Sequence, residues 1–546
     1  MSLVKHIKEH AALGISSGGS NRVTVGADGG TFSTIQAAVD YVETQDAFTV
    51  AEGTHTDYYD VGGGNYLGVA IGTWAQGSKT ITLLRGLGGY DLEYCDSTLW
   101  LKVDNEDRYY KIEQYDYNGS TSTITVDCER LEASLSGSTE TFTLYRENMH
   151  IIDVLDDYSD ETVTIDGIVC ITFTGETFEW GCKHPSPSAS ALKRTSNFTC
   201  GVIAFTRMVI SNSSSYGFMA RTDTWDEANT IELRLYDMGL RASATDLFSP
   251  SVTLGSVRID NVHLKHNPQT PLSHLFFFDT NGTVECNKLT WDLSPTTVGG
   301  VPFMGEALPF DGTCARVMKV SGVDIIARNP SGLMNSLTLI SGSEYVNDLF
   351  VSDITLNGDV FTTGTGRFIK LIDADSQATP GIGSVVATSE IFMSNVVINA
   401  PKEDEDRTYL YTGKVGQTSN VYMTGCKGGH ALDNGSDTIS CLSNDFPQLI
   451  DYAATITPDA NLGNTIIVGE LTGNITINAP KNPQVGQVLR IMFEQDATGS
   501  RSITWNAIFR TKGNPTGSAN NKIVFVFWYD GTDWIHSDGS GSGWLS

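Results

Sequence analysis

Two aspartates, Asp279 and Asp311, occupy the same place in a recurring pattern of short apolar segments. Each ends an expected strand, and the residue before it, Phe278 or Phe310, should point inward, so that both carboxylates face out. If the two strands are stacked about 4.8 Å apart, the carboxyl groups would lie roughly 5–7 Å apart. Carboxylates about 5–5.5 Å apart suit retaining glycoside hydrolysis, and those about 6.5–9.5 Å apart suit the inverting reaction. One aspartate would then be the acid and the other the nucleophile or base.

Both aspartates also stand directly before turn sequences, TNG and GT. Their carboxylates could therefore simply accept hydrogen bonds from the backbone N–H groups of those turns. The catalytic interpretation and this structural one both remain open at the level of the sequence.

A second polar cluster, RTDTWDEAN at 221–229, surrounds a tryptophan on which a sugar ring could stack. The alternative is a polar loop whose tryptophan packs against the body of the protein. With a further aspartate at the end of an aligned strand, the expected ligand-binding residues are Arg221, Asp223, Trp225, Asp226, Glu227 and Asp373.

Several classes of function are disfavoured by composition and by missing motifs. A formal net charge of −29 repels nucleic acid. No apolar run approaches the roughly 18 residues of a membrane-spanning helix, and the first residues lack the apolar core of a secretory signal. The chain contains no HExxH, P-loop or paired CxxC motif, so we expect neither a metal nor a cofactor.

The elements that would position these residues follow a repeat. The outline of VRIDNVHL, at 257–264, is apolar-x-apolar, two mostly polar residues, and apolar-x-apolar again. Copies start 26–42 residues apart, at positions 163, 203, 231, 257, 284, 318, 349, 391 and 421. A constant outline with variable spacing predicts a solenoid whose coils differ in loop length. The second middle residue suits left-handed backbone angles at Gly167, Asn261, Gly322, Asp353 and Asn395.

Each coil should contain a second strand, and the ends of these strands align at Arg221, Ser249, Asp279, Asp311, Ser341, Asp373 and Thr412. A β-sandwich is the main alternative to the solenoid. It would give alternating strands but no recurring turn outline.

Three further elements flank or interrupt the repeat. Residues 23–42 predict a strand, a glycine-rich turn and an amphipathic helix, capped by Ser33 or Thr34, that covers the first coil. Residues 96–147 predict a small inserted β-barrel. Residues 446–546 predict a C-terminal antiparallel β-sandwich, in which Asp530 and Gly531 form a hairpin turn.

The segment VGADGGTFSTIQAAVDYV resembles the start of the pectin-lyase-like right-handed parallel β-helix, as in phage tailspikes and polysaccharide depolymerases. Through the repeat outline, the resemblance extends over about residues 23–445. It implies an all-β fold, a right-handed parallel β-helix with a capping helix. It does not imply one chemistry, because this fold hosts lyases, hydrolases, esterases and binding proteins.

Near the C-terminus, NITINAP and FVFWYDGTDW resemble a module of phage tail proteins that closes a trimer or binds sugar. Together the resemblances imply a homotrimeric tailspike on the phage virion, made in the host cytoplasm without a signal peptide. Residues 1–22 would attach it to other tail or baseplate proteins. It would bind and cleave a bacterial surface polysaccharide. The rivals are an adhesin that does not cut, a polysaccharide lyase with a Lys, Arg, His or Tyr base, and a tail component without a ligand.

Overall fold

The described part of the chain is built almost entirely of β-strands, with α2 (Ile35–Glu43) as its one α-helix. The computed structural model describes residues 21–537 apart from residues 28, 51–68, 77, 79, 84–98, 104–108, 118–121, 127–138, 160–162, 166, 176–178, 183–191, 195–200, 213–218, 222–230, 243–252, 267–272, 278, 281–282, 294–306, 312–316, 328–335, 342–345, 358–367, 374–387, 400–407, 414–417, 428–429, 433–437, 442–446, 461–462 and 512–516. Within these residues, no helix has the length and apolar character needed to cross a membrane.

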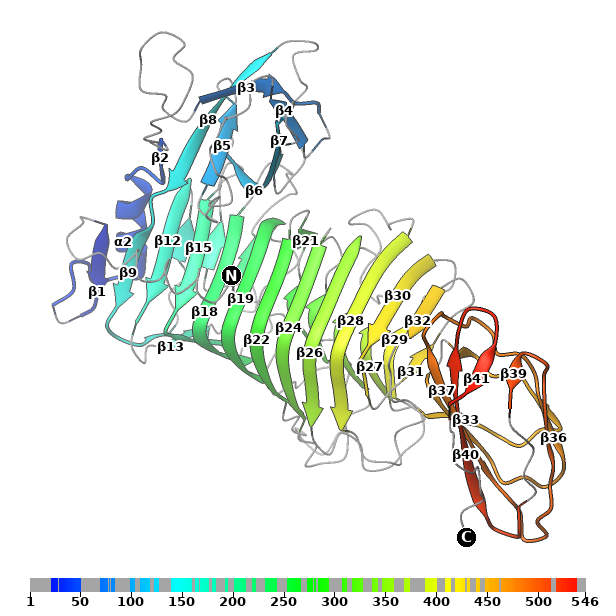
Figure 1. The fold of residues 1–546 in the computed structure, drawn as a ribbon. Helices are drawn as coiled ribbons and strands as arrows, with labels where there is room; N and C mark the ends of the chain where they lie inside the picture. The colour runs from blue at the N-terminus through cyan, green and yellow to red at the C-terminus, as the bar shows by residue number, and fades with distance from the viewer. Residues whose placement is uncertain are drawn as a thin grey trace.

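Twelve strands form one continuous parallel sheet, the long sheet, which runs through the middle of the molecule (Figure 1). In spatial order they are β1 (Arg22–Val25), β9 (His150–Val154), β12 (Val169–Thr174), β15 (Gly201–Thr206), β18 (Ile231–Ala242), β19 (Thr253–His266), β22 (Thr283–Leu293), β24 (Val317–Ala327), β26 (Asp348–Asn357), β28 (Thr388–Asn399), β30 (Thr418–Thr424) and β32 (Thr438–Cys441). Shorter strands join it at β10 (Tyr158–Ser159), β13 (Glu179–Cys182), β16 (Val209–Asn212) and β21 (Asp279–Thr280).

Six strands form a second parallel sheet, the short sheet, with the order β20 (Ser273–Phe277), β23 (Ala307–Asp311), β25 (Ser336–Ser341), β27 (Phe368–Asp373), β29 (Thr408–Thr412) and β31 (His430–Leu432). From β22 to β32 the described strands alternate between the long and the short sheet. Inward side chains of both sheets, such as Val351 and Leu371, belong to a single apolar core. The prediction of stacked parallel strands is therefore confirmed. Earlier in the chain, β11 (Val163–Ile165), β14 (Leu192–Arg194) and β17 (Met219–Arg221) form a three-stranded parallel sheet.

The polar pair in the repeat outline forms a turn at the same level of each coil. Its second residue has a left-handed φ between 49° and 64° at Arg207, Asp237, Asn261, Lys288, Gly322, Asp353, Asn395 and Gly425. Side chains at this position also join neighbouring coils. Asn261 Nδ2 donates to Asp237 Oδ1 over 2.6 Å, and Asn395 Nδ2 donates to Asp353 Oδ1 over 3.1 Å.

The strand register shows that two copies of the repeat start at other residues than predicted. Ile203 pairs with Leu233 and not with Ile231, so that copy starts two residues later than predicted. The copy placed at 163, with Gly167 at its turn, lies between β11 and β12, and the first copy in the long sheet starts at Ile171, the partner of Ile203. Apolar alternation has a period of two residues, so a shift by two residues leaves the pattern intact and only hydrogen bonding selects the frame.

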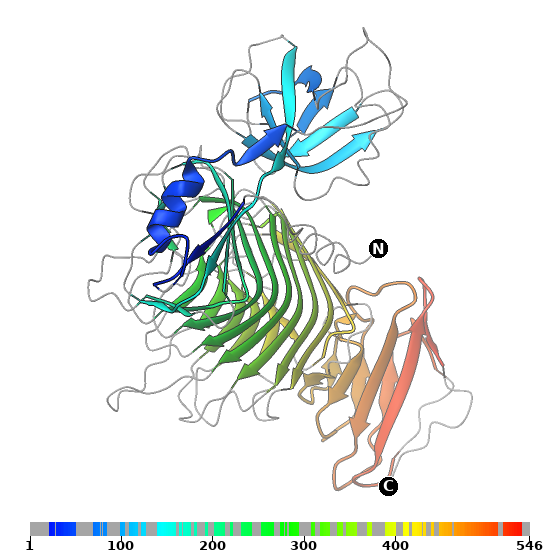
Figure 2. The same ribbon diagram turned by 90° about the vertical axis from the view of Figure 1, so that its left-hand side faces the viewer.

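Helix α2 forms where it was predicted and packs against the first strands of the parallel sheets. Thr34 is the N-cap, and its Oγ1 accepts a hydrogen bond from the backbone N–H of Ala37 over 3.1 Å. The helix buries an apolar face against β1, β9 and β11, at the end of the stack (Figure 2). That face consists of Ile35, Ala38, Val39 and Val42. The helix thereby shields a sheet edge that would otherwise be open to other chains.

A small closed β-barrel projects above the first coils (Figure 2). Its six strands are β8 (Glu140–Glu147), β3 (Val69–Thr73), β4 (Thr80–Leu83), β7 (Ser122–Val126), β6 (Tyr109–Tyr117) and β5 (Leu99–Val103), closed by the pairing of β5 with β8 and extended by β2 (Phe48–Val50). The inserted barrel is confirmed, but it starts before residue 96 because β3 and β4 supply two of its strands.

The C-terminal part, from β33 onward, consists of two sheets around one apolar core. One contains β33 (Pro447–Ile450), β35 (Thr465–Val468), β37 (Val488–Glu494), β40 (Lys522–Tyr529), β41 (Trp534–His536) and β39 (Phe509–Arg510), and the other contains β34 (Thr455–Ile456), β36 (Ile475–Ile477) and β38 (Ile503–Trp505).

The predicted antiparallel arrangement is wrong for most of these strands. Among the strands described here, only the pairs β37–β40 and β40–β41 are antiparallel. Up to β38 the chain alternates between the two sheets, so a strand pairs in parallel with the next but one. The hairpin turn is confirmed: Asp530 Oδ1 accepts hydrogen bonds from the backbone N–H groups of Thr532 and Asp533, each over 2.8 Å, and Gly531 has φ 102°.

Backbone strain at the stacked turns is testable at Asn395, whose φ is 53°. Replacement by valine forces a β-branched residue into the left-handed region and should lower the free energy of unfolding by about 1–2 kcal/mol. Asn395→Gly is the matched control, because it removes the same side chain but tolerates the angle. Urea unfolding of both variants separates the two effects, and equal stabilities would contradict the strain argument.

Candidate functional site

The two aspartates predicted to form a catalytic pair are not register neighbours. Asp311 is the last residue of β23, and its partner on β20 is Phe277. Asp279 lies in β21, where it pairs with Thr253 at the edge of the long sheet. The inferred pairing is wrong because the chain leaves the short sheet after Phe277, two residues earlier than expected. Phe278 lies outside the described residues, and the catalytic role of either aspartate stays a prediction.

Four of the aligned strand ends have the predicted register, whereas Ser249 lies outside the described residues and Arg221 lies in the three-stranded sheet. Asp311, Ser341, Asp373 and Thr412 are successive partners in the short sheet. Asp373, however, is 4% exposed, and Thr412 Oγ1 donates a hydrogen bond to its Oδ1 over 2.7 Å. The expected outward orientation is therefore wrong for Asp373, whose carboxylate joins two neighbouring coils.

The predicted binding cluster is only partly placed. Arg221 ends β17 and pairs with Arg194 of β14. Asp223, Trp225, Asp226 and Glu227 lie outside the described residues, so their role stays a prediction. Across the part of the chain that the structure places, no group of His, Cys, Asp or Glu side chains could hold a metal ion.

A row of outward side chains, one from each of nine consecutive strands, runs along the outer face of the long sheet. We call it the outer row. Its members are register partners in sequence: Thr172, Ala204, Arg234, Arg258, Glu285, Lys319, Phe350, Phe392 and Tyr422. Strands in a sheet lie about 4.8 Å apart, so the row repeats at that interval.

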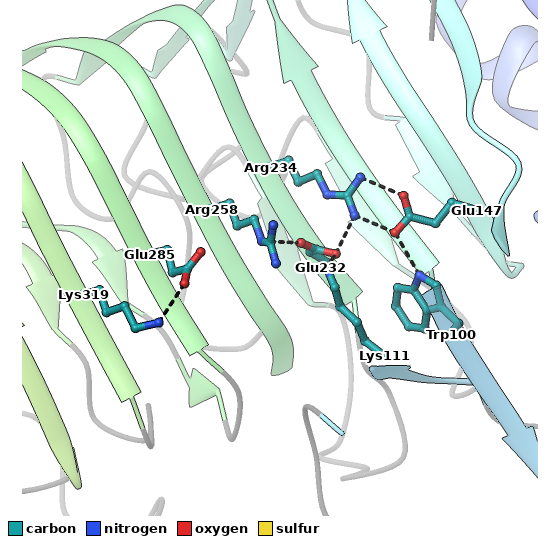
Figure 3. Close-up of polar contacts among 8 residues, drawn as sticks. All are labelled: Trp100, Lys111, Glu147, Glu232, Arg234, Arg258, Glu285 and Lys319. Atoms are coloured by element: carbon teal, nitrogen blue, oxygen red, sulfur yellow. Dashed lines mark hydrogen bonds and ion pairs between the residues drawn. The ribbon is translucent and has the colours of Figure 1, made fainter. Parts of the chain in front are cut away.

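The barrel covers one end of the outer row. Phe48 and Trp100 of the barrel region pack with Cys170 and Val202, which lie on the outer face of the long sheet. Beside this apolar contact is a buried cluster of charges (Figure 3).

In the buried cluster, Arg234 links two carboxylates. Its Nη2 lies 2.6 Å from Glu147 Oε1 and 2.7 Å from Glu232 Oε2, and its Nη1 donates to Glu147 Oε2 over 2.8 Å. Lys111 of the barrel pairs with Glu232, and Arg258 Nε lies 3.0 Å from Glu232 Oε1. Trp100 Nε1 donates to Glu147 Oε1 over 2.9 Å. The joint between barrel and sheet thus rests on paired charges.

Burial and neighbouring charges shift the protonation of the buried cluster. Burial, with repulsion from Arg258, lowers the pKa of Lys111 to about 8. Burial alone would raise the pKa of Glu232, but attraction to Arg234, Lys111 and Arg258 outweighs it and holds that pKa far below the usual range. Glu147 and Glu232 are almost fully buried and held by Arg234, so this cluster serves as a structural joint.

The other end of the outer row is aromatic and open to solvent. Phe350, Phe392 and Tyr422 are 41%, 37% and 39% exposed. Their rings stack in order, with centroids 5.0 Å apart in both pairs and planes within 9° and 11° of parallel. Between the two ends, Lys319 Nζ lies 3.1 Å from Glu285 Oε1 (Figure 3).

Two polar rows flank the aromatic residues on the same strands. Asp348, Glu390 and Asn420 stand two residues before them, and Ser352, Ser394 and Thr424 stand two residues after them. The sequence carried a signal for this face: the second letter of LFVSDITL, IFMSNVVI and VYMTGCKG is aromatic each time. The predicted site did not include these aromatic residues, because it was built on acidic residues at the ends of strands.

The fold and this face define a mainly parallel β protein with a long exposed surface. Residues 456–534 match a family model described as "Putative phage tail fibre C-terminal domain". This match supports a phage tail protein, and with it a place in the virion tail. No curated protein and no solved structure matches the chain.

The buried cluster generates a stability prediction. Glu232→Gln removes the carboxylate that Lys111, Arg234 and Arg258 share, and the loss of this buried partner should cost about 3–5 kcal/mol. Glu285→Gln is the matched control, because its partner Lys319 has a half-exposed side chain and such pairs contribute about 0–1 kcal/mol. Urea unfolding followed by tryptophan fluorescence measures both, and similar losses would contradict the joint described above.

The depressed pKa of Glu232 predicts that the stability of the protein depends on pH. The pKa of Glu232 is depressed in the folded protein, so its stabilising contribution is fully present above its unfolded value of 4.5 and is lost as the pH falls below that. The stability advantage of the parent over Glu232→Gln should therefore shrink between about pH 6 and about pH 3. A constant difference over that range would show that Glu232 is not held as an anion by its cationic neighbours.

Proposed function

We propose that the protein is a receptor-binding protein of a phage tail that recognises a bacterial surface polysaccharide, such as a capsule, an exopolysaccharide or a lipopolysaccharide O-chain. The outer row is the observation that carries the proposal: it offers side chains at a regular interval along a rigid sheet, which suits a repeating polymer. The tail fibre match at residues 456–534 supports the tail location.

The proposal includes an architecture. The long and short sheets would be faces of a right-handed parallel β-helix, which agrees with parallel pairing throughout and with alternation between the sheets. Three copies would assemble side by side, through the C-terminal part or along the β-helix. Residues 1–22 would attach the trimer to other tail or baseplate proteins.

Cleavage of the bound polysaccharide is the second part of the proposal. Asp279 or Asp311 would act as acid or base in glycoside hydrolysis. Because the two are not register neighbours, the partner carboxylate of either would have to come from another part of the fold or from another copy. A binding protein that does not cut is the alternative, and a lyase is a further one.

Purified bacterial polysaccharides, tested as a panel with the parent protein, separate these alternatives. Hydrolysis releases reducing ends, a lyase gives unsaturated products that absorb ultraviolet light, and an adhesin binds without either product. If an aspartate is catalytic, Asp279→Asn or Asp311→Asn should lower the cleavage rate by about a hundredfold or more while binding persists.

Asp324→Asn is the control for these variants, because Asp324 is an exposed aspartate of the long sheet outside the predicted site. Cleavage by both test variants at the parental rate would remove the two aspartates from the mechanism. Failure of the parent to bind any polysaccharide of its host would contradict the proposed function itself.

A further inference from the structure

We propose that Phe350, Phe392 and Tyr422, with the polar rows beside them, form a binding site for an uncharged stretch of polysaccharide. This inference rests on the proposed function and names the place on the sheet and the class of sugar. The face that carries it is formed by β26, β28 and β30.

The exposure of the three rings is the first argument. Single exposed apolar residues are ordinary on protein surfaces, but three large rings in one row form a continuous apolar strip. Atoms in contact lie about 3.5–4 Å apart, so nearly parallel rings with centroids at 5.0 Å must be offset. The offset leaves part of each ring face uncovered, and the C–H face of a sugar ring can pack there.

The spacing of the rings is the second argument. Strand pairing repeats the aromatic position with a centroid spacing of 5.0 Å, which is close to the length of one sugar residue in an extended chain. Successive sugar rings can therefore meet successive side chains. A compact ligand would use one ring at most.

The flanking rows supply the hydrogen bonds that sugar hydroxyl groups require. Asp348 and Glu390 accept, whereas Asn420, Ser352 and Ser394 can both donate and accept. Asn420 Nδ2 donates to Glu390 Oε1 over 2.6 Å, which orients both groups across neighbouring strands. A hydroxyl is donor and acceptor at once, so it matches this mixture better than an apolar partner would.

The negative charge of this face favours an uncharged ligand over an acidic one. Carboxylates at Asp348 and Glu390 stand beside the rings, and the whole chain has a net charge of −29. An acidic polysaccharide would meet repulsion here, and so would the same face of a second copy. An uncharged sugar chain would not be repelled.

The test uses the full chain with a panel of purified neutral and acidic bacterial polysaccharides and measures affinity. Replacing any one ring by leucine keeps the apolar bulk but removes the flat face. Each single substitution should weaken binding to a neutral polysaccharide about two- to tenfold. The triple variant Phe350→Leu, Phe392→Leu, Tyr422→Leu should lose most of the affinity. Glu390→Gln leaves the rings intact and should weaken the same binding.

Leu155→Ala is the control, because it alters a 53% exposed apolar residue just after β9, at the opposite end of the long sheet, and should bind as the parent does. Parental affinity in the triple variant would overturn the site and leave the proposed function standing. Binding by the parent to acidic polysaccharides alone would overturn the ligand class. Binding to no polysaccharide would overturn the proposed function and this inference with it.

Discussion

Parallel hydrogen bonding from one strand of the long sheet to the next is the constraint on which the rest of the structure depends. It places Leu233 level with Val257, 24 positions later in the chain, and Leu349 level with Ile391, 42 positions later. The inward positions are then apolar and the turn positions left-handed, whereas the outer row changes in character along its length. The surface of the long sheet is thus a set of straight rows, and the chemistry of a row is set by which residues share a register position.

The same rows explain how the barrel is held. The end of the outer row beside β15 and β18 carries Ala204 and Arg234, and the barrel places Trp100, Lys111 and Glu147 against this region. Burying the four charged groups of Lys111, Glu147, Glu232 and Arg234 costs desolvation that a simple apolar contact would avoid. We interpret the network as a device for orientation: Glu147 meets Arg234, and Lys111 meets Glu232, only when the barrel sits in one position on the sheet.

The outer row therefore divides into a covered end, a charged middle and an aromatic end. The covered end holds two parts of the chain together, and its groups are too buried to meet a polymer. The aromatic end lies toward the C-terminal part of the sheet, on the side where the chain continues into the region matched by the tail fibre model (Figure 1). The sugar-binding site that we propose would thus lie at the end of the sheet next to that region.

The sequence by itself determined the local structure and the kind of architecture. The start of α2 at Ser33 or Thr34, its apolar face, the alternating strands and the left-handed residue of each turn all depend on neighbours in the chain. Asn261, Gly322, Asp353 and Asn395 were recognisable because few residue types tolerate that angle.

Only the tertiary structure decided the register and the direction of pairing. Alternation repeats every two residues, so it looks the same when a strand slides by two, and Phe277 displaced Asp279 as the partner of Asp311 for that reason. The sequence of a strand also does not show whether its neighbour runs parallel or antiparallel to it. The C-terminal pairs were therefore expected to be antiparallel, but most of them are parallel. The aromatic letters of β26, β28 and β30 were visible in the sequence, but they became a surface only when hydrogen bonds between coils placed them side by side.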